Sequence, residues 1–295
     1  MKTRLLFLML CISALTYAQY PTNGLVAAYE LNGNLVDQAT GTSLAPTGIM
    51  LYAFDRFNNS GQAANLLFGS ASRGDIDFPS GGFNNQSKDQ LAYSFWIKTS
   101  INDSNRRVII EDSDRASDTD TDWHGYFFYL KDGKIGSRYR MEHSGGDFEN
   151  GSLAPNFIAD GEWHHITIVM RHFTTFLNGA TTDVNTFIGI DGVEVVSATA
   201  VLPNSLGNIS ISYDTVGDIA IGNNRTHNLP AANKYPNLID NILIYNRLFV
   251  AGEVETICKY NNYCFVPNSS ILSTTTINNN DATIAISETG TSDIA

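Results

Sequence analysis

The sequence DGEWHHITIVM, residues 160–170, joins a turn to a strand-like run. Asp160 and Gly161 suit the turn, and the run that follows is rich in the aromatic and β-branched residues that favour strands. Four other segments have the same design: GLVAAYELNGN from Gly24, YSFWIKT from Tyr93, IDGVEVV from Ile190 and IDNILIYNR from Ile239. A chain built of such segments is predicted to fold almost entirely into strands.

The spaces between these segments hold more short strand-like runs and clusters of Gly, Asn, Asp and Ser. Strands are predicted over residues 91–99, 107–111, 126–130, 163–171, 193–198, 209–212 and 239–245. The sequence KDGK, residues 131–134, predicts a tight hairpin because Asp-Gly accepts positive φ angles. One short helix is predicted over residues 250–260. Many short strands with turn signals predict an all-β sandwich or jelly roll.

The ends of the chain differ in composition from its middle. Lys2 and Arg4 precede an apolar run, and Ala18 is a small residue at the expected cleavage position, so residues 1–18 are predicted to be a secretory signal peptide. Lipid attachment at Cys11 is a weaker alternative, because Leu10 precedes it where a small residue is needed. One domain is predicted over residues 20–265, and residues 266–295 read as a polar linker or tail.

The rest of the chain has no run of about 18 apolar residues, so we expect no transmembrane anchor. The protein is expected to be secreted, extracellular or at the cell surface. In such an oxidising compartment Cys258 and Cys264 are predicted to form a disulfide. A metal site at these two cysteines is the less favoured alternative, because no histidine is near them in the sequence.

The charge balance excludes one class of partner. The chain has 30 acidic and 18 basic residues and a formal net charge of -12. Nucleic acid is not an expected partner, because phosphate binding needs a positive face. An acidic surface suits neutral sugars, cations or basic protein patches, and charge alone does not distinguish these from simple solubility.

The ordered motifs resemble the laminin-G-like branch of the concanavalin A-like lectin/glucanase superfamily. The matching segments are residues 24–37 (GLVAAYELNGNLVD), 55–69 (DRFNNSGQAANLLFG), 94–98, 161–171, 190–195 and 239–254 (IDNILIYNRLFVAGEV). Each motif is weak alone, but the set has the order of the family over about residues 20–258. The resemblance implies a two-sheet antiparallel jelly-roll sandwich and an extracellular recognition module. After Arg171 the chain is longer than the usual link to the turn at Asp191.

The opening and closing motifs of this family generally lie beside each other at one end of the sandwich. They contain Asn32, Asp37 and Asp240, and Asn58 lies in the second motif. Carboxylate, amide and carbonyl oxygens are the ligands that Ca²⁺ prefers. A structural calcium ion at these four residues is therefore one prediction, and the equally weighted alternative is that Asp37 and Asp240 cap turns.

A second group of polar and aromatic residues predicts a ligand platform. The residues are Trp123, His124, Tyr126, Arg138, Arg140 and His143. Aromatic faces stack on sugar rings and arginines bond to hydroxyls, so a glycan site is the hypothesis. Alternate strand residues face opposite sides, so at least half of the set is expected to point inward. The acidic run of residues 111–122 before it is interpreted as a solvated loop, with a second calcium site as the alternative.

Catalysis is not favoured by the sequence. His164 and His165 lie in one strand without a nucleophilic cysteine or serine elbow beside them, so they are interpreted as structural. Trp96 and Trp163 are interpreted as core or near-core residues. The paired carboxylates of glucanases and the full lyase motifs of this fold are not found. The leading hypothesis is a non-catalytic module that recognises a polysaccharide or glycoprotein glycan. A protein-adhesion or spacer domain is the alternative, and a polysaccharide lyase or hydrolase is the third.

Overall fold

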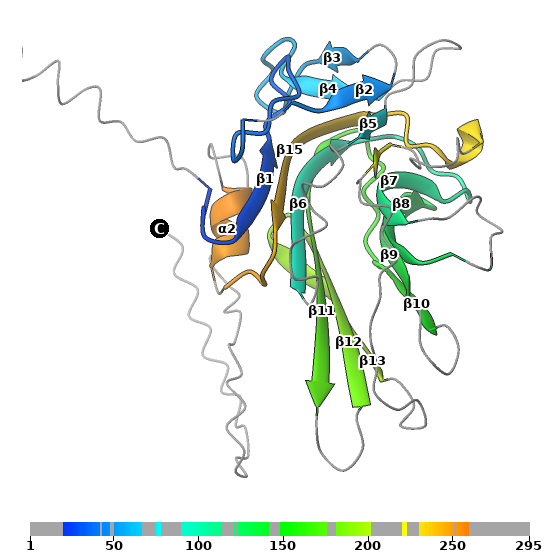
Figure 1. The fold of residues 1–295 in the computed structure, drawn as a ribbon. Coiled ribbons are helices and arrows are strands. Elements are labelled where there is room, and N and C mark those ends of the chain that lie inside the picture. The colour runs from blue at the N-terminus through cyan, green and yellow to red at the C-terminus, as the bar shows by residue number, and fades with distance from the viewer. Residues whose placement is uncertain are drawn as a thin grey trace, which may run out of the picture.

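The computed structural model describes residues 20–41, 43–47, 50–66, 75–77, 90–113, 121, 123–141, 148–175, 181–201, 220–222, 230–250 and 252–259. Within these residues, strands form two antiparallel sheets that face each other as a sandwich (Figure 1). The all-β jelly-roll prediction is confirmed. The expected signal peptide, the tail over residues 266–295 and the strand predicted at 209–212 lie outside the described residues.

One sheet has eight strands, in the order β13-β12-β11-β6-β15-β4-β3, with β1 also paired to β15. Strands β1 and β4, both from the N-terminal part of the chain, therefore share one edge of β15. The strands are β1 (Leu25–Tyr29), β3 (Leu51–Ala53), β4 (Ala63–Asn65), β6 (Gln90–Lys98), β11 (Trp163–Thr175), β12 (Thr181–Ile190), β13 (Val193–Val201) and β15 (Leu238–Tyr245).

The other sheet has seven strands, in the order β10-β9-β8-β7-β14-β5-β2. Its long strands are consecutive in sequence and joined as hairpins, whereas its short strands come from distant parts of the chain. The strands are β2 (Ala45–Thr47), β5 (Asp75–Asp77), β7 (Arg107–Ser113), β8 (Gly125–Lys131), β9 (Lys134–Met141), β10 (Phe148–Leu153) and β14 (Ala220–Ile221).

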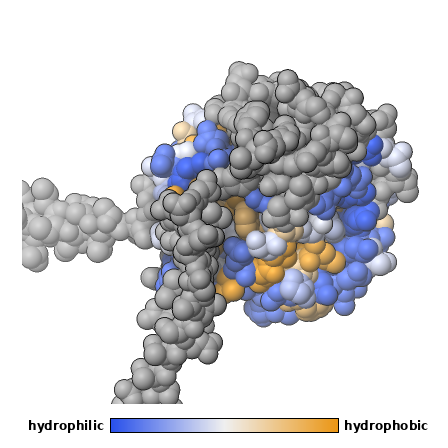
Figure 2. All heavy atoms as spheres, turned by 90° about the horizontal axis from the view of Figure 1, so that it is seen from below, coloured by the Kyte–Doolittle hydropathy of each residue, from blue (hydrophilic) through white to orange (hydrophobic). Residues whose placement is uncertain are grey.

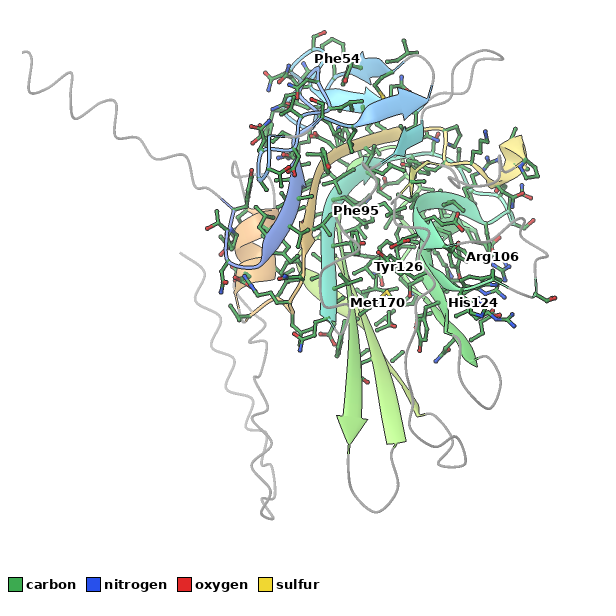
Figure 3. All side chains as sticks on the ribbon, viewed as in Figure 1. Phe54, Phe95, Arg106, His124, Tyr126 and Met170 are labelled. Carbon is green, nitrogen blue, oxygen red and sulfur yellow. The ribbon has the colours of Figure 1, made fainter. Side chains whose placement is uncertain are left out.

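The main core fills the space between the sheets. Every second residue of β6, including Tyr93, Phe95 and Ile97, joins it from one side, and Tyr126 and Phe128 of β8 join it from the other. Figure 3 shows Phe95, Tyr126 and Met170 in this space. Seen from below, the described surface has an apolar area bordered by hydrophilic residues (Figure 2). Because successive residues of β8 point to opposite faces of the sheet, only every second side chain of this strand belongs to the main core.

The outer face of the eight-stranded sheet is also buried in part. Helix α2 (Glu253–Cys258) lies beside β1 and β15, and its Ile257 packs with Tyr20, Ala28 and Leu243 (Figure 1). Trp96, Trp163 and Cys258 form a further small cluster. Both tryptophans are therefore buried, as predicted, but outside the main core. Cys264 lies outside the described residues, so the disulfide stays a prediction.

Two hairpins have the turn residues that the sequence indicates. Asp132 and Gly133 link β8 to β9 with φ angles of 51° and 67°, and Asp191 and Gly192 link β12 to β13 with 52° and 83°. Both turns therefore use positive φ at both central positions, which matches the twist of the strands. The longer segment after Arg171 continues β11 and pairs with β12.

Candidate ligand-binding face of the seven-stranded sheet

Strand β8 separates two layers of aromatic side chains. Tyr126 and Phe128 point into the main core, whereas Phe127 and Tyr129 belong to a separate cluster on the outer face of the seven-stranded sheet. The sequence GYFFYLK produces this division because successive strand residues point to opposite faces. The sheet thus carries an apolar layer on the side that faces away from its partner sheet.

The outer cluster consists of Trp123, Phe127, Tyr129 and Val108. The ring centroids of Trp123 and Phe127 are 5.4 Å apart, and those of Phe127 and Tyr129 are 5.6 Å apart, so the three rings form a continuous row. All three are buried. The Nε1 donor of Trp123 is buried without a hydrogen-bond partner among the described residues. A buried donor without a partner is costly.

Arginines cover both ends of this row. The guanidinium of Arg138 lies 5.6 Å from the Trp123 ring centroid, and that of Arg106 lies 5.9 Å from the Tyr129 ring centroid. Both distances are within the range of cation–π attraction. The groups that this face offers to a ligand are therefore guanidinium groups above rings, and not the open ring faces that the sequence analysis expected.

Glu149 of β10 holds two arginines of β9. It forms an ion pair with Arg138 and lies 3.7 Å from Arg140. The register explains the contact, because Glu149 pairs with Arg140, and Arg138 is the next outward-facing residue of β9. Sharing one carboxylate fixes the orientation of both arginines.

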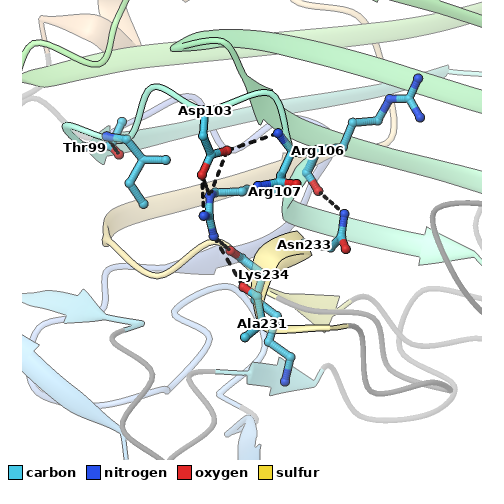
Figure 4. Close-up of polar contacts among 9 residues, drawn as sticks. Thr99, Asp103, Arg106, Arg107, Ala231, Asn233 and Lys234 are labelled. Carbon is cyan, nitrogen blue, oxygen red and sulfur yellow. Dashed lines mark hydrogen bonds and ion pairs between the residues drawn. The ribbon is translucent and has the colours of Figure 1, made fainter.

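A polar network positions Arg106 at the start of β7 (Figure 4). Asn233 donates its side-chain amide to the Arg106 carbonyl at 3.2 Å. Arg107 donates to the Lys234 carbonyl at 3.1 Å and pairs with Asp103 at 2.5 Å. Figure 3 shows Arg106 and His124 together on the outer side of the seven-stranded sheet. The loop before β7 is thereby anchored to the segment that follows strand β14.

Only part of the predicted platform lies together. Trp123, Arg138 and Arg140 are on the outer face, and His124 is half-buried beside it. Tyr126 points the other way, where its hydroxyl lies 2.5 Å from that of Tyr93. His143 lies outside the described residues. The expectation that at least half of the set would point inward is not met, because Tyr126 is the only one of the five described members that joins the main core.

The acidic run that precedes the platform divides in the same manner. Glu111 pairs with Phe127 on the outer side and accepts the Ser113 hydroxyl at 2.5 Å, while Asp112 pairs with the inward-facing Tyr126. Both carboxylates are buried. The prediction of a solvated loop is therefore wrong for residues 111–113, which belong to β7. Residues 114–120 and 122 lie outside the described residues, so for them it stays a prediction.

Sequence reasoning missed four members of this face. Phe127, Tyr129, Arg106 and Glu149 complete it, and none was assigned to the platform from the sequence. Strict alternation from Tyr126 would have found Phe127 and Tyr129. No local signal points to Glu149, because its contact with Arg138 and Arg140 depends on the register between β9 and β10.

The predicted calcium ligands are not brought together. Asp37 accepts the backbone N–H groups of Ala28 and Ala39 and the Thr40 hydroxyl, as a turn cap does. Tyr29 pairs with Asp37 on one side and with Ile242 of β15 on the other, so β1 separates Asp37 from the strand of Asp240.

The two asparagines have local roles. The Asn32 side chain donates to Glu30, and Asn58 has a φ of 65° in the turn that Asp55 caps. In the described part of the chain no three His, Cys, Asp or Glu side chains gather as metal ligands would. Calcium stays a prediction.

Asp240 belongs to a buried polar cluster on the outer side of the eight-stranded sheet. Arg56 donates to its carboxylate at 2.6 Å, and the Arg56 guanidinium also lies 4.9 Å from the Trp96 ring centroid. Burial raises the pKa of Asp240 to about 7, and the charge of Arg56 opposes this rise. The carboxylate is thus engaged by a cation of the protein itself.

His164 and His165 make the contacts of structural histidines. His164 lies 2.8 Å from Asp191, and this bond raises its pKa. The Nε2 atom of His165 lies 2.8 Å from the Ser94 hydroxyl, and burial lowers its pKa to about 3. A general base for the Ser94 hydroxyl would need solvent access and a carboxylate at Nδ1. The Nδ1 atom is instead buried without a hydrogen-bond partner among the described residues.

Together these features define an antiparallel β-sandwich with a candidate ligand face on its seven-stranded sheet. The family model described as the concanavalin A-like lectin/glucanases superfamily, in its laminin G form, matches residues 69–255. The chain therefore belongs to this superfamily. No curated protein matches the sequence. In the described residues, no helix has the length and apolar character needed to cross a membrane.

Solved structures with the same fold include binding domains of botulinum neurotoxins. The serotype G binding domain has 16% identity and a TM-score of 0.54, and the match covers 79% of this chain and 50% of that one. A type C neurotoxin, whose cell entry depends on two ganglioside molecules, has 12% identity and a TM-score of 0.53, with 82% and 52% covered. The chain thus spans about half the length of these structures. At such identities the likeness shows the fold alone.

Proposed function

We propose that the protein is an extracellular, non-catalytic module that binds a glycan on the outer face of its seven-stranded sheet. The observation that carries this proposal is the outer layer of β8 and β9, where Arg138 and Arg106 lie over a row of buried rings. Guanidinium groups fixed in this way form directed hydrogen bonds to sugar hydroxyl or acidic groups. Membership of a superfamily of lectins and glucanases supports the same function.

The test is native affinity electrophoresis of the purified protein through gels that each contain one polysaccharide. Retardation by a glycan is the expected result, and Arg140→Ala should abolish it while Arg247→Ala, on the other sheet, should not. Normal mobility across a broad panel would contradict the proposal. Running the gels with calcium and with EDTA also tests whether the predicted calcium ion takes part.

Protein adhesion is the second candidate function. Leu153 and Phe157 are 41% and 50% exposed. Leu153 pairs with Gly136 on the outer face, and Phe157 lies against Gly133. Exposed apolar side chains next to a polar face are typical of protein contacts. Leu153→Asp together with Phe157→Asp should abolish adhesion to a protein partner and leave glycan retardation unchanged.

A further inference from the structure

We infer that the glycan is anionic, a polysaccharide that carries carboxylate or sulfate groups. This inference rests on the proposed glycan-binding function and names the class of its ligand. It differs from what the net charge of -12 indicates, because it depends on where the basic residues lie. A small number of well-placed cations can create a positive face on an acidic protein.

The three strands that carry the face are basic on their outer side. The charged residues of β8, β9 and β10 are Lys131, Lys134, Arg138, Arg140 and Glu149. Their partners in register show that all five point outward, because Leu130, Ile135 and Tyr139 between them belong to the main core. On these three strands four cations thus stand against one carboxylate. On the β7 side of the face, Arg106 adds a fifth cation above Tyr129, and the buried Glu111 adds a second carboxylate.

The cations form a line along β9. Lys134, Arg138 and Arg140 occupy alternate positions of one strand, and Gly136 takes the remaining position without a side chain. At about 3.3 Å per residue, the line from Lys134 to Arg140 is about 20 Å long. Such a line suits a linear polymer with repeated anionic groups better than a single small anion.

The arginines are held in place before a ligand arrives. Arg138 lies against the Trp123 ring and pairs with Glu149, and its side chain is 22% exposed. A planar guanidinium that is fixed on two sides loses little freedom on binding a carboxylate or sulfate. Because the rings beneath are buried, stacking on neutral sugar rings is not available to them. Charge-assisted bonds are the interaction that this face can supply.

The test uses three probes: dextran sulfate, polygalacturonate and neutral dextran. We expect the purified protein to bind at least one of the two charged polymers in a calorimetric titration and not neutral dextran. The two charged probes distinguish sulfate from carboxylate as the recognised group. Raising the salt from about 50 mM to about 300 mM should weaken binding, because exposed charges are screened.

Arg247 offers a matched control for Arg138. It pairs with Glu253, its side chain is 18% exposed, and its guanidinium lies 5.5 Å from the Tyr245 ring centroid, but it follows β15 of the other sheet. Arg138→Gln should weaken binding about tenfold, whereas Arg247→Gln should leave it unchanged. Lys134→Glu should likewise weaken binding, whereas its control Lys259→Glu should leave binding unchanged. Melting curves of each variant confirm that it is folded.

The outcomes separate this inference from the proposed function. Binding of neutral dextran alone, or of another neutral glycan, would overturn the anionic ligand and leave glycan binding intact. Equal losses in the Arg138 and Arg247 variants would remove the assignment to this face. A further titration with duplex DNA is the specificity control, and equally tight binding of DNA would replace glycan recognition with general polyanion binding. Binding of no polysaccharide would overturn both.

Discussion

His165 shows how one buried side chain makes stability depend on pH. Desolvation lowers its pKa to about 3; the negative charge of Asp191 opposes this fall, whereas the nearby Arg56 cation acts in the same direction as burial. In the unfolded chain a histidine titrates near pH 6.5. Between about pH 3 and pH 6.5, His165 therefore stays neutral in the folded state, whereas the unfolded chain binds a proton at this histidine. The stability that neutral His165 contributes is fully present above about pH 6.5 and is lost as the pH falls toward about 3.

We expect His165→Gln to reduce the loss of stability on acidification. Below about pH 6, the free energy of unfolding of the wild-type protein should fall more steeply than that of the variant, by about 1.4 kcal/mol per pH unit. Urea unfolding of the wild-type protein and the variant at neutral and mildly acidic pH measures this slope. Comparing the two proteins cancels the opposite contribution of His164, whose pKa is raised by Asp191. Parallel pH profiles would show that His165 does not titrate as described.

Asp240 gives a second prediction at the scale of one residue. Asp240→Ala leaves the buried Arg56 guanidinium without its carboxylate, so we expect a loss of about 3–5 kcal/mol in the free energy of unfolding. Because the partner is an arginine, the loss should be equal in calcium and in EDTA. Thermal melting in both buffers measures it. A loss seen only in calcium would instead support the predicted calcium ion.

Gly136 of β9 leaves space on the outer face for the ring of Tyr129. Gly136 stands opposite Tyr129, and a Cβ atom there would lie 2.4 Å from Cζ of that tyrosine. Its own φ is not among the positive values, so the requirement is for space and not for backbone geometry. The glycine lets the Tyr129 ring lie against the sheet under Arg106.

We expect Gly136→Ala to destabilise the protein by about 1–3 kcal/mol, because the Tyr129 ring must move. The same change in a Tyr129→Ala background should cost much less, since the obstructing ring is gone. A double-mutant cycle from urea unfolding measures the coupling. Additive costs would show that the two residues do not contact each other in solution.

Most elements could be predicted because their signals are local. Neighbouring residues in the sequence determine the turns at Asp132 and Asp191. They also determine which side chains of β6 and β15 alternate between the two faces of the sheet. The site could be predicted only in part, because its contacts join distant segments. Arg56 and Asp240 are 184 residues apart, and the charge of the outer face depends on strand register. Composition averages over the surface and so could not reveal a basic face on an acidic protein.

At the scale of the whole molecule, β15 is the strand on which the eight-stranded sheet is assembled. It lies between β6 on one side and β1 and β4 on the other, so residues 25–29 find their partner only at residues 242–245. During synthesis β1 cannot pair with β15 until almost the entire domain has been made. Contacts of such long sequence separation form slowly. Late pairing of β1 would keep the sheet incomplete until the chain is nearly finished, as the predicted secretion requires of a chain that is exported before it folds.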